Sequence, residues 1–277
     1  MFLLGLAPPN RETFLYDGGE GLLTRPYLST LIGWRLIGWP LLIGGFALAR
    51  FASDREWWKS YLVLSAQLAI LFFTPIGGLT NDANYLILGS CLALGALGVP
   101  ILLCRFWLKE PLDFTIVKGR WTLGQWLWIP GTFLLAMAVF YFYFRHWTPD
   151  LHLQWYLAPE GSPDVGFWRW RIFWGCNFVG IFDELAFINI AFQLIRRHFS
   201  YQISALSAGV FFSSFLYDMA FHGPGPIITF LFALIQASLL EKHGSLLYIV
   251  LLHLIVDTVL FAYIVANYYD LGFWQAF

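Results

Sequence analysis

Long apolar runs separated by short polar stretches dominate the sequence. A helix needs about 20 mostly apolar residues to cross the hydrocarbon core of a bilayer. The pattern predicts eight such helices, at 27–49, 60–79, 84–104, 121–144, 168–195, 201–221, 226–240 and 245–268. Turn-forming stretches such as 80–82 and 223–226 fall between these runs. Because the seventh run is short and follows a Gly-Pro-Gly-Pro segment, we expect it to be tilted or partly re-entrant.

The composition supports an all-α polytopic transmembrane bundle of about eight helices. Of the 277 residues, 59% are hydrophobic and only 12% are charged, whereas a soluble domain carries about 25% charged residues. A net charge of -1 implies no basic surface for nucleic acid. Three single cysteines without a CxxC pair favour neither a disulfide scaffold nor a zinc ribbon.

The distribution of Lys and Arg predicts the orientation of the bundle. Connections 50–59 and 105–120 are basic, and Arg196, Arg197 and Lys242 lie in later connections of the same side. The alternate connections are nearly free of basic residues. The positive-inside rule therefore places the basic connections in the cytoplasm and both termini outside.

We expect three parts along the chain. Residues 1–26 are predicted to form an interfacial N-terminal segment, and residues 27–144 the first four transmembrane helices. The last four runs, over 168–268, have short connections and are predicted to form a compact four-helix unit. The first partner of such a chain is the lipid bilayer.

Ionisable side chains inside the apolar runs mark a candidate site. Each costs a few kcal/mol within a membrane, and such groups usually have a function. One run carries two adjacent carboxylates, and two others each carry a carboxylate and an imidazole four residues apart, which share a helix face. These residues are Asp183, Glu184, Asp218, His222, His253 and Asp257. We expect the helices that carry them to direct them into one cavity.

Three chemistries are open to such a cluster. A carboxylate and an imidazole can activate a water molecule for attack on a carbonyl. Glu184, His222 and His253 could instead hold a divalent metal such as zinc, because carboxylates and imidazoles are common zinc ligands. The groups could also relay protons or cations through the membrane.

The order and spacing of these residues resemble the CPBP (CAAX protease and bacteriocin-processing, or Abi) intramembrane proteases, which include the type II CAAX prenyl endopeptidases. The stretch 241–257, with Gly-Ser-Leu followed by His253 and then Asp257, is similar to the last motif of the family. The gap between His222 and His253, with one short helix between them, is also typical. The resemblance covers about 168–268 and implies a four-helix core of catalytic type.

The resemblance implies a role for each residue of the site. Asp183 stands at the place of the water-activating Glu, and Glu184 at that of the second Glu. His222 and His253 match the two motif histidines, and Asp257 takes the position that helps to hold the oxyanion. Three positions depart from the family pattern: Asp183 is one methylene shorter than Glu, Ile188 replaces an Arg, and Asp218 replaces a Phe.

The sequence therefore leaves three functional hypotheses. The first is an intramembrane endopeptidase that hydrolyses membrane-associated or prenylated peptide or protein substrates with an activated water. The second is a catalytically degenerate relative, which serves as a membrane scaffold, partner subunit or immunity-type protein with a membrane partner protein. The third is a proton or cation transporter. In each case we expect a multi-pass protein of a prokaryotic cytoplasmic membrane, with no cofactor other than a possible zinc ion.

Overall fold

The computed structural model of the chain describes residues 43–48, 50–51, 56–74, 82–147, 165–219, 221, 223–268 and 273. Within these ranges the regular structure is helical, which confirms the prediction of an all-α polytopic bundle. Five helices are long and apolar enough to cross a membrane, at 85–108, 123–146, 166–196, 225–243 and 246–267. The N-terminal segment 1–26 and most of the predicted helix 27–49 lie outside the described residues.

Several helices of the bundle are built from consecutive segments. The segments are α3 (Trp57–Phe73), α4 (Asp82–Ser90), η2 (Cys91–Gly98), α5 (Val99–Leu102), η3 (Leu103–Leu108), α6 (Leu123–Trp147), α7 (Val165–Asp183), η6 (Glu184–Ala191), α8 (Phe192–Arg196), α9 (Tyr201–Met219), α10 (Gly225–His243) and α11 (Leu246–Tyr268). Segments η2, η3 and η6 are π-helical turns within otherwise α-helical rods.

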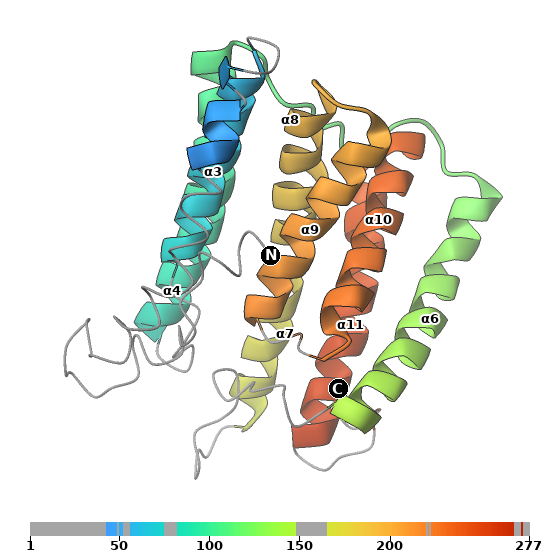
Figure 1. Cartoon of the computed structure of the whole chain (residues 1–277). Coiled ribbons are helices and arrows are strands. Elements are labelled where there is room, and N and C mark those ends of the chain that lie inside the picture. The colour runs from blue at the N-terminus through green and yellow to red at the C-terminus, as the bar shows by residue number, and fades with distance from the viewer. Residues whose placement is uncertain are drawn as a thin grey trace, which may run out of the picture.

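The helices form two parts that meet along η6 and α8 (Figure 1). In the first part, α3 packs against the rod that runs from α4 to η3. In the second part, α9 pairs with α10, and α11 packs against both α6 and α7. A large apolar cluster runs from the second part into the first, where it includes Leu68 and Leu92. In the second part it includes four fully buried aromatic residues, Phe182, Phe187, Phe212 and Phe215. The candidate site residues lie on the helices around this cluster.

The seventh predicted helix is longer than the sequence analysis expected. It runs without a break over 19 residues as α10, so the predicted shortness is wrong and the helix is not interrupted. The expected tilt in the membrane stays a prediction. The prolines that suggested a break stand at the start of the helix, where proline is tolerated because the first N–H groups have no partner within the helix. Gly244 then ends α10 in the left-handed conformation that favours glycine.

A buried glutamine joins the two parts of the bundle. Gln67 of α3 is 1% exposed, and its amide nitrogen donates hydrogen bonds to the carbonyl oxygens of Ala96 in η2 and Ala186 in η6, at 3.1 and 3.2 Å. Both acceptors lie in π-helical segments, which occur frequently at functional sites. Because η6 begins with Glu184, this contact supports the helix that carries the candidate site.

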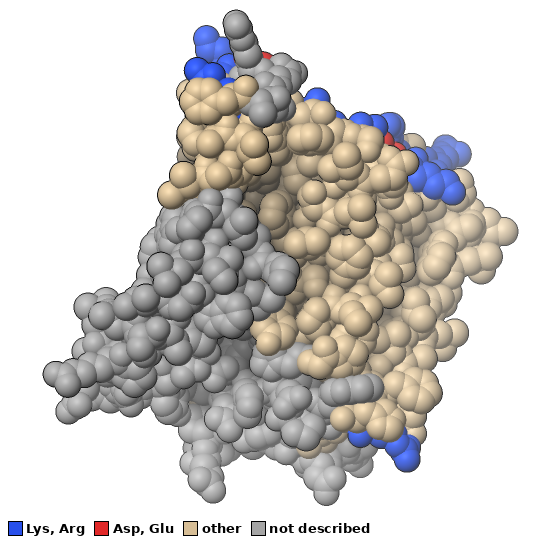
Figure 2. All heavy atoms as spheres, in the orientation of Figure 1, with Lys and Arg blue, Asp and Glu red and all other residues tan. Residues whose placement is uncertain are grey.

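Connections that the sequence assigns to one side of the membrane lie at one end of the bundle. Most Lys and Arg residues visible in Figure 2 gather at the end where α10 finishes. The connection 109–122 packs there against the start of α11, since Leu246 N–H donates to Thr115 O, and the Ser245 hydroxyl donates to Ile116 O. Arg197 forms an ion pair with Glu110 of the same connection, at 3.1 Å. Which side of the membrane this end faces remains a prediction.

Candidate functional site

Two rods of the bundle bring four of the predicted site residues together. Asp183 ends α7 and Glu184 begins η6, while His253 and Asp257 lie one turn apart on α11. All four side chains are buried, with exposed fractions of 1%, 0%, 4% and 6% in that order.

A glycine lets these two rods approach so closely. Gly180 of α7 faces the carboxyl group of Asp257, and a Cβ atom at this position would overlap that group and press on the His253 ring.

His253 is held between two carboxylates. Its Nδ1 lies 2.7 Å from Oε1 of Glu184, and its Nε2 lies 3.6 Å from Oδ1 of Asp257. The same Oε1 accepts a hydrogen bond from the amide nitrogen of Gln236 at 2.8 Å, so this oxygen acts as an acceptor toward both neighbours. The imidazole therefore donates through Nδ1 and keeps Nε2 for other partners. The rings of Phe212 and Phe232 pack against the imidazole.

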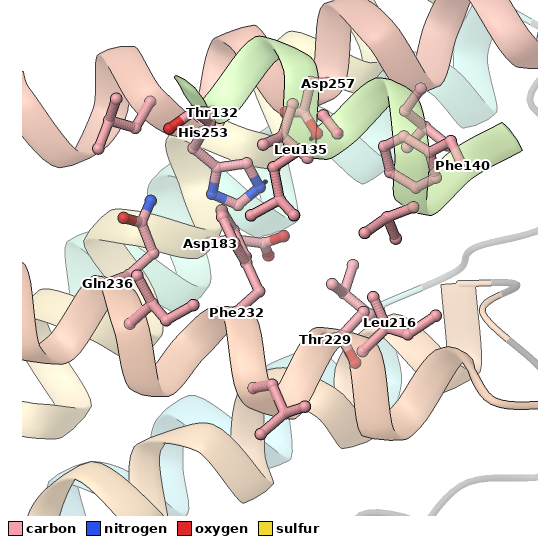
Figure 3. A pocket seen from close by; sticks show the side chains of 18 of the residues that line it. Thr132, Leu135, Phe140, Asp183, Leu216, Thr229, Phe232, Gln236, His253 and Asp257 are labelled. Atoms are coloured by element: carbon pink, nitrogen blue, oxygen red, sulfur yellow. Dashed lines mark ion pairs between the residues drawn. The ribbon is translucent and has the colours of Figure 1, made fainter. Parts of the chain in front are cut away.

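Asp183 presents its carboxylate to a cavity of about 340 Å³. Helices α6, α7, α9, α10 and α11 all contribute to the lining, which is apolar over most of its area. Among the described residues, neither carboxylate oxygen of Asp183 has a hydrogen-bond partner. In Figure 3 its oxygens point into the open space, with His253 and Asp257 beside it. Buried polar groups are nearly always paired, so this carboxylate is suited to bind a polar group that enters the cavity.

The two adjacent carboxylates do not face the cavity together. Asp183 lines it, whereas Glu184 lies behind His253 and does not. Successive residues of an α-helix point about 100° apart, so a doublet seldom serves one space. Oε2 of Glu184 and Oδ2 of Asp257 also lack partners within the described part of the chain.

The other predicted positions either lie away from the site or are not among the residues that the structure describes. His222 and the side chain of Asp218 are not among the described groups, so their predicted contribution is untested. Ile188, at the position where the resembled family has an arginine, is fully buried in the apolar cluster. No guanidinium therefore stabilises the acidic pair from this position.

The described residues contain no metal centre. Within the described ranges, no three His, Cys, Asp or Glu side chains are grouped so that they could hold a metal ion. The ligand set that the sequence suggested includes His222, which lies outside these ranges. Glu184 and His253 bond directly to each other, and this contact occupies Nδ1 of the imidazole and one carboxylate oxygen.

Sequence reasoning missed two residues that shape the site, Gln236 and Gly180. Gln236 stands as the one strongly polar side chain in the middle of the apolar run 226–240, and this isolation was a usable signal. Gly180 gave no such signal, because a glycine in a transmembrane helix is common and its role here depends on which helix lies opposite.

The comparison with protein families covers the helices that carry the candidate site. A family model described as type II CAAX prenyl endopeptidase Rce1-like matches residues 165–259, about a third of the chain. This range begins at α7 and ends two residues after Asp257. Searches of curated proteins and of solved structures gave no match. The family match confirms the resemblance found in the sequence: the carboxyl-terminal helical unit of this integral membrane protein is similar to the type II CAAX prenyl endopeptidases of the CPBP family.

Proposed function

We propose that the protein is an intramembrane endopeptidase that hydrolyses peptide bonds of membrane-associated or prenylated substrates. One observation carries this proposal: the carboxylate of Asp183 has no partner among the described residues and faces a cavity beside an oriented imidazole. A general base needs a free acceptor beside the space that the substrate occupies. Both oxygens of Asp183 lack a partner among the described residues, and the side chain lines the cavity. The family match supports the same reaction class.

The proposed reaction divides the roles between the two carboxylates. Asp183 accepts a proton from a water molecule while the water oxygen forms a bond to the carbonyl carbon of the substrate. The tetrahedral intermediate then collapses as the C–N bond breaks, and the leaving nitrogen takes up the proton. His253 assists this transfer through Nε2, because Glu184 holds Nδ1 and so fixes the tautomer. Asp257 lies 3.6 Å from Nε2 and stabilises the imidazolium that forms when Nε2 takes up a proton.

The cavity has a side entrance that suits a substrate coming from the lipid. Trp128 and Leu135 of α6 line the cavity and are also exposed on the outside of the bundle. Leu231 and Ile235 of α10 do the same from the opposite side. In Figure 3, α6 and α10 lie on opposite sides of the space. We therefore propose that an apolar segment or a prenyl chain enters between these two helices, at the level of the hydrocarbon core.

Cleavage of defined peptides tests the proposal. Purified protein in lipid nanodiscs is incubated with a library of membrane peptides, which includes prenylated peptides ending in CAAX sequences, and the products are identified by mass spectrometry. We expect hydrolysis by the wild type and none by Asp183→Ala or His253→Ala. If no library member is cleaved, or if both variants cleave at the wild-type rate, the proposal is wrong.

Ile188 favours a second candidate, a catalytically degenerate relative that serves as a membrane scaffold or partner subunit. A fully buried isoleucine stands where the family pattern has an arginine, so one member of the expected polar cluster is missing. If this candidate is correct, Ala substitutions at the five predicted site residues change stability but no cellular function. These residues are Asp183, Glu184, His222, His253 and Asp257. This candidate also expects a membrane protein partner to co-purify in stoichiometric amount.

A further inference from the structure

Gln236 of α10 holds His253 by two separate routes, and we propose that it is a positioning residue for the His253–Glu184 pair. The inference rests on the proposed function for its kinetic consequence, but its structural consequence can be measured without any substrate. Gln236 lies outside the motifs on which the family resemblance was recognised.

The side chain of Gln236 connects three helical segments at one point. It is 1% exposed, and its amide nitrogen donates to Oε1 of Glu184 at 2.8 Å and to the carbonyl oxygen of Ile249 at 3.0 Å. These acceptors belong to η6 and α11, whereas Gln236 itself belongs to α10. One carboxamide therefore fixes the spacing between the two elements that carry the site.

Its second contact reaches the backbone of His253 indirectly. Ile249 precedes His253 by four residues on α11. In an α-helix the N–H of a residue donates to the carbonyl four positions earlier, so Ile249 O is also the acceptor for the backbone N–H of His253. Gln236 thus holds the turn that carries His253 and, through Glu184, the Nδ1 atom of its ring.

The orientation of the Gln236 carboxamide follows from its neighbours. The carbonyl of Ile249 can only accept a hydrogen bond, so the amide nitrogen and not the oxygen must face it. If the carboxamide were rotated by about 180°, its oxygen would face the carbonyl oxygen of Ile249, and Glu184 would lose this donor. Oε1 of Glu184 is consequently held by two donors, Gln236 and His253. These bonds keep it from turning toward the cavity, where it would compete with Asp183 for the proton of the water molecule.

Removal of the two donors should therefore disturb catalysis more than folding. Gln236→Met keeps the length of the side chain without its polar atoms, and Gln236→Glu keeps its shape but cannot donate when ionised. Partners that orient a functional histidine typically change activity by about 10- to 100-fold. We expect both variants to lower kcat by about that factor, with KM within about twofold of wild type.

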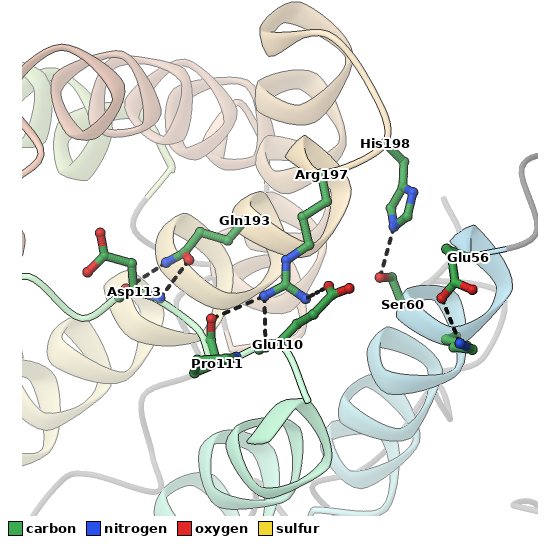
Figure 4. Close-up of polar contacts among 9 residues, drawn as sticks. Glu56, Ser60, Glu110, Pro111, Asp113, Gln193, Arg197 and His198 are labelled. Atoms are coloured by element: carbon green, nitrogen blue, oxygen red, sulfur yellow. Dashed lines mark hydrogen bonds and ion pairs between the residues drawn. The ribbon is translucent and has the colours of Figure 1, made fainter. Parts of the chain in front are cut away.

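Gln193→Met provides a matched control at the basic end of the bundle. The amide of Gln193 donates to Asp113 O at 2.7 Å, and its oxygen accepts from Asp113 N–H at 2.9 Å, as Figure 4 shows. Its amide nitrogen also donates to Oδ1 of Asn189 at 2.5 Å. The substitution therefore removes three hydrogen bonds, one more than Gln236→Met removes, but none of them reaches the cavity. We expect it to lower thermal stability and to leave kcat unchanged.

Nuclear magnetic resonance of the histidine ring supplies the readout that a purely structural role would not move. In protein labelled with ¹⁵N-histidine, the His253 signal is assigned from its loss in His253→Gln. We expect a strongly deshielded, slowly exchanging Nδ1 proton in wild type and in Gln193→Met. In Gln236→Met, or in Gln236→Glu if the first variant does not fold, we expect this signal to shift upfield or to exchange faster.

The two measurements separate the possible failures. An unchanged Nδ1 signal in the folded Gln236 variants overturns the positioning role, whatever the kinetics show. If the wild type hydrolyses no substrate while the Nδ1 signal changes as expected, the proposed function fails but the positioning role stands. If kcat falls equally in the Gln236 and Gln193 variants, the effect is general destabilisation and the positioning role is rejected.

Discussion

Gly180 and Asp257 face each other across the interface of α7 and α11, with no room for a side chain on Gly180. A Cβ atom there would overlap the Asp257 carboxyl group and lie 3.1 Å from Cδ2 of His253. Small residues allow transmembrane helices to approach closely. Here the close approach brings the His253 ring within hydrogen-bonding distance of Glu184, so a packing requirement and the geometry of the site depend on the same position.

Gly180→Ala should therefore damage stability and activity together. Because the added methyl group can fit only if α7 and α11 move apart, we expect the free energy of unfolding to fall by about 1–3 kcal/mol. Hydrolysis should fall by about 100-fold or more, since a displacement of about 1 Å in a catalytic group has that effect. Denaturant titration in micelles and a peptide cleavage assay measure the two quantities.

Gly131→Ala is the control for this substitution. Gly131 lies on α6, and a Cβ atom there would meet nothing within 4 Å. We expect its stability to stay within about 0.5 kcal/mol of wild type and its cleavage rate to be unchanged. Equal stability and activity in the Gly180 and Gly131 variants would show that α7 and α11 are not held as the structure describes.

Asp183→Asn and Asp183→Glu test the identity of the general base. Loss of a positioned base lowers the rate by about 100- to 10,000-fold, and we expect that loss of kcat in Asp183→Asn without a fall in stability. Asp183→Glu extends the carboxylate into the cavity to the length found in the family. We expect it to raise kcat by about 10- to 100-fold. Single-turnover cleavage measures the chemical step directly.

Asn177→Ala is the control for Asp183→Asn. It separates the loss of the general base from the loss of any polar group on the same helix. Asn177 is buried on α7, but its amide donates to Phe173 O within the helix and it does not line the cavity. Its variant should keep the wild-type kcat. A wild-type kcat in Asp183→Asn would remove Asp183 from the proposed mechanism.

The sequence predicts the local features of the site better than the contacts between helices. His253 and Asp257 share one helix face because a spacing of four residues brings side chains together in any α-helix. The number of apolar runs likewise indicates a helical membrane bundle, since only length and composition are needed. These features require no knowledge of which helices are neighbours.

The remaining features depend on tertiary packing and on local changes in helical winding. The hydrogen bond between Glu184 and His253 joins residues 69 positions apart, and no periodicity in the chain encodes it. The π-helical turn that begins at Glu184 changes the direction of the following side chains, yet its residues are ordinary helix formers. Spacing indicates that Asp183 and Glu184 point apart, but only the packing of α11 determines that Asp183 faces the cavity and Glu184 faces His253.

Bulky residues at the side entrance should block lipid-borne substrates. Leu135→Trp and Leu231→Trp place an indole on opposite edges of the opening between α6 and α10. We expect KM for a membrane-embedded peptide to rise by about 10-fold or more, with stability unchanged because both positions are exposed. KM for a short water-soluble peptide should change less. Cleavage of both peptides in nanodiscs gives the ratio of the two changes in KM.

Leu134→Trp is the matched control for the side entrance. Leu134 is the neighbour of Leu135 on α6 and is also exposed, but it does not line the cavity. Its variant should process both peptides as wild type does. If Leu134→Trp and Leu135→Trp behave alike, substrates do not enter between α6 and α10.

Gln67→Met tests whether the first helices support the site. Since this side chain joins α3 to the carbonyl oxygens of Ala96 and Ala186, its loss leaves two buried acceptors without this donor. We expect the free energy of unfolding to fall by about 1–3 kcal/mol, as measured by denaturant titration. In Ser65→Ala the lost bond, to Tyr61 O, lies within α3, so the fall should be smaller. Equal effects would mean that the contact between the two parts of the bundle contributes little, and that the carboxyl-terminal unit holds its geometry alone.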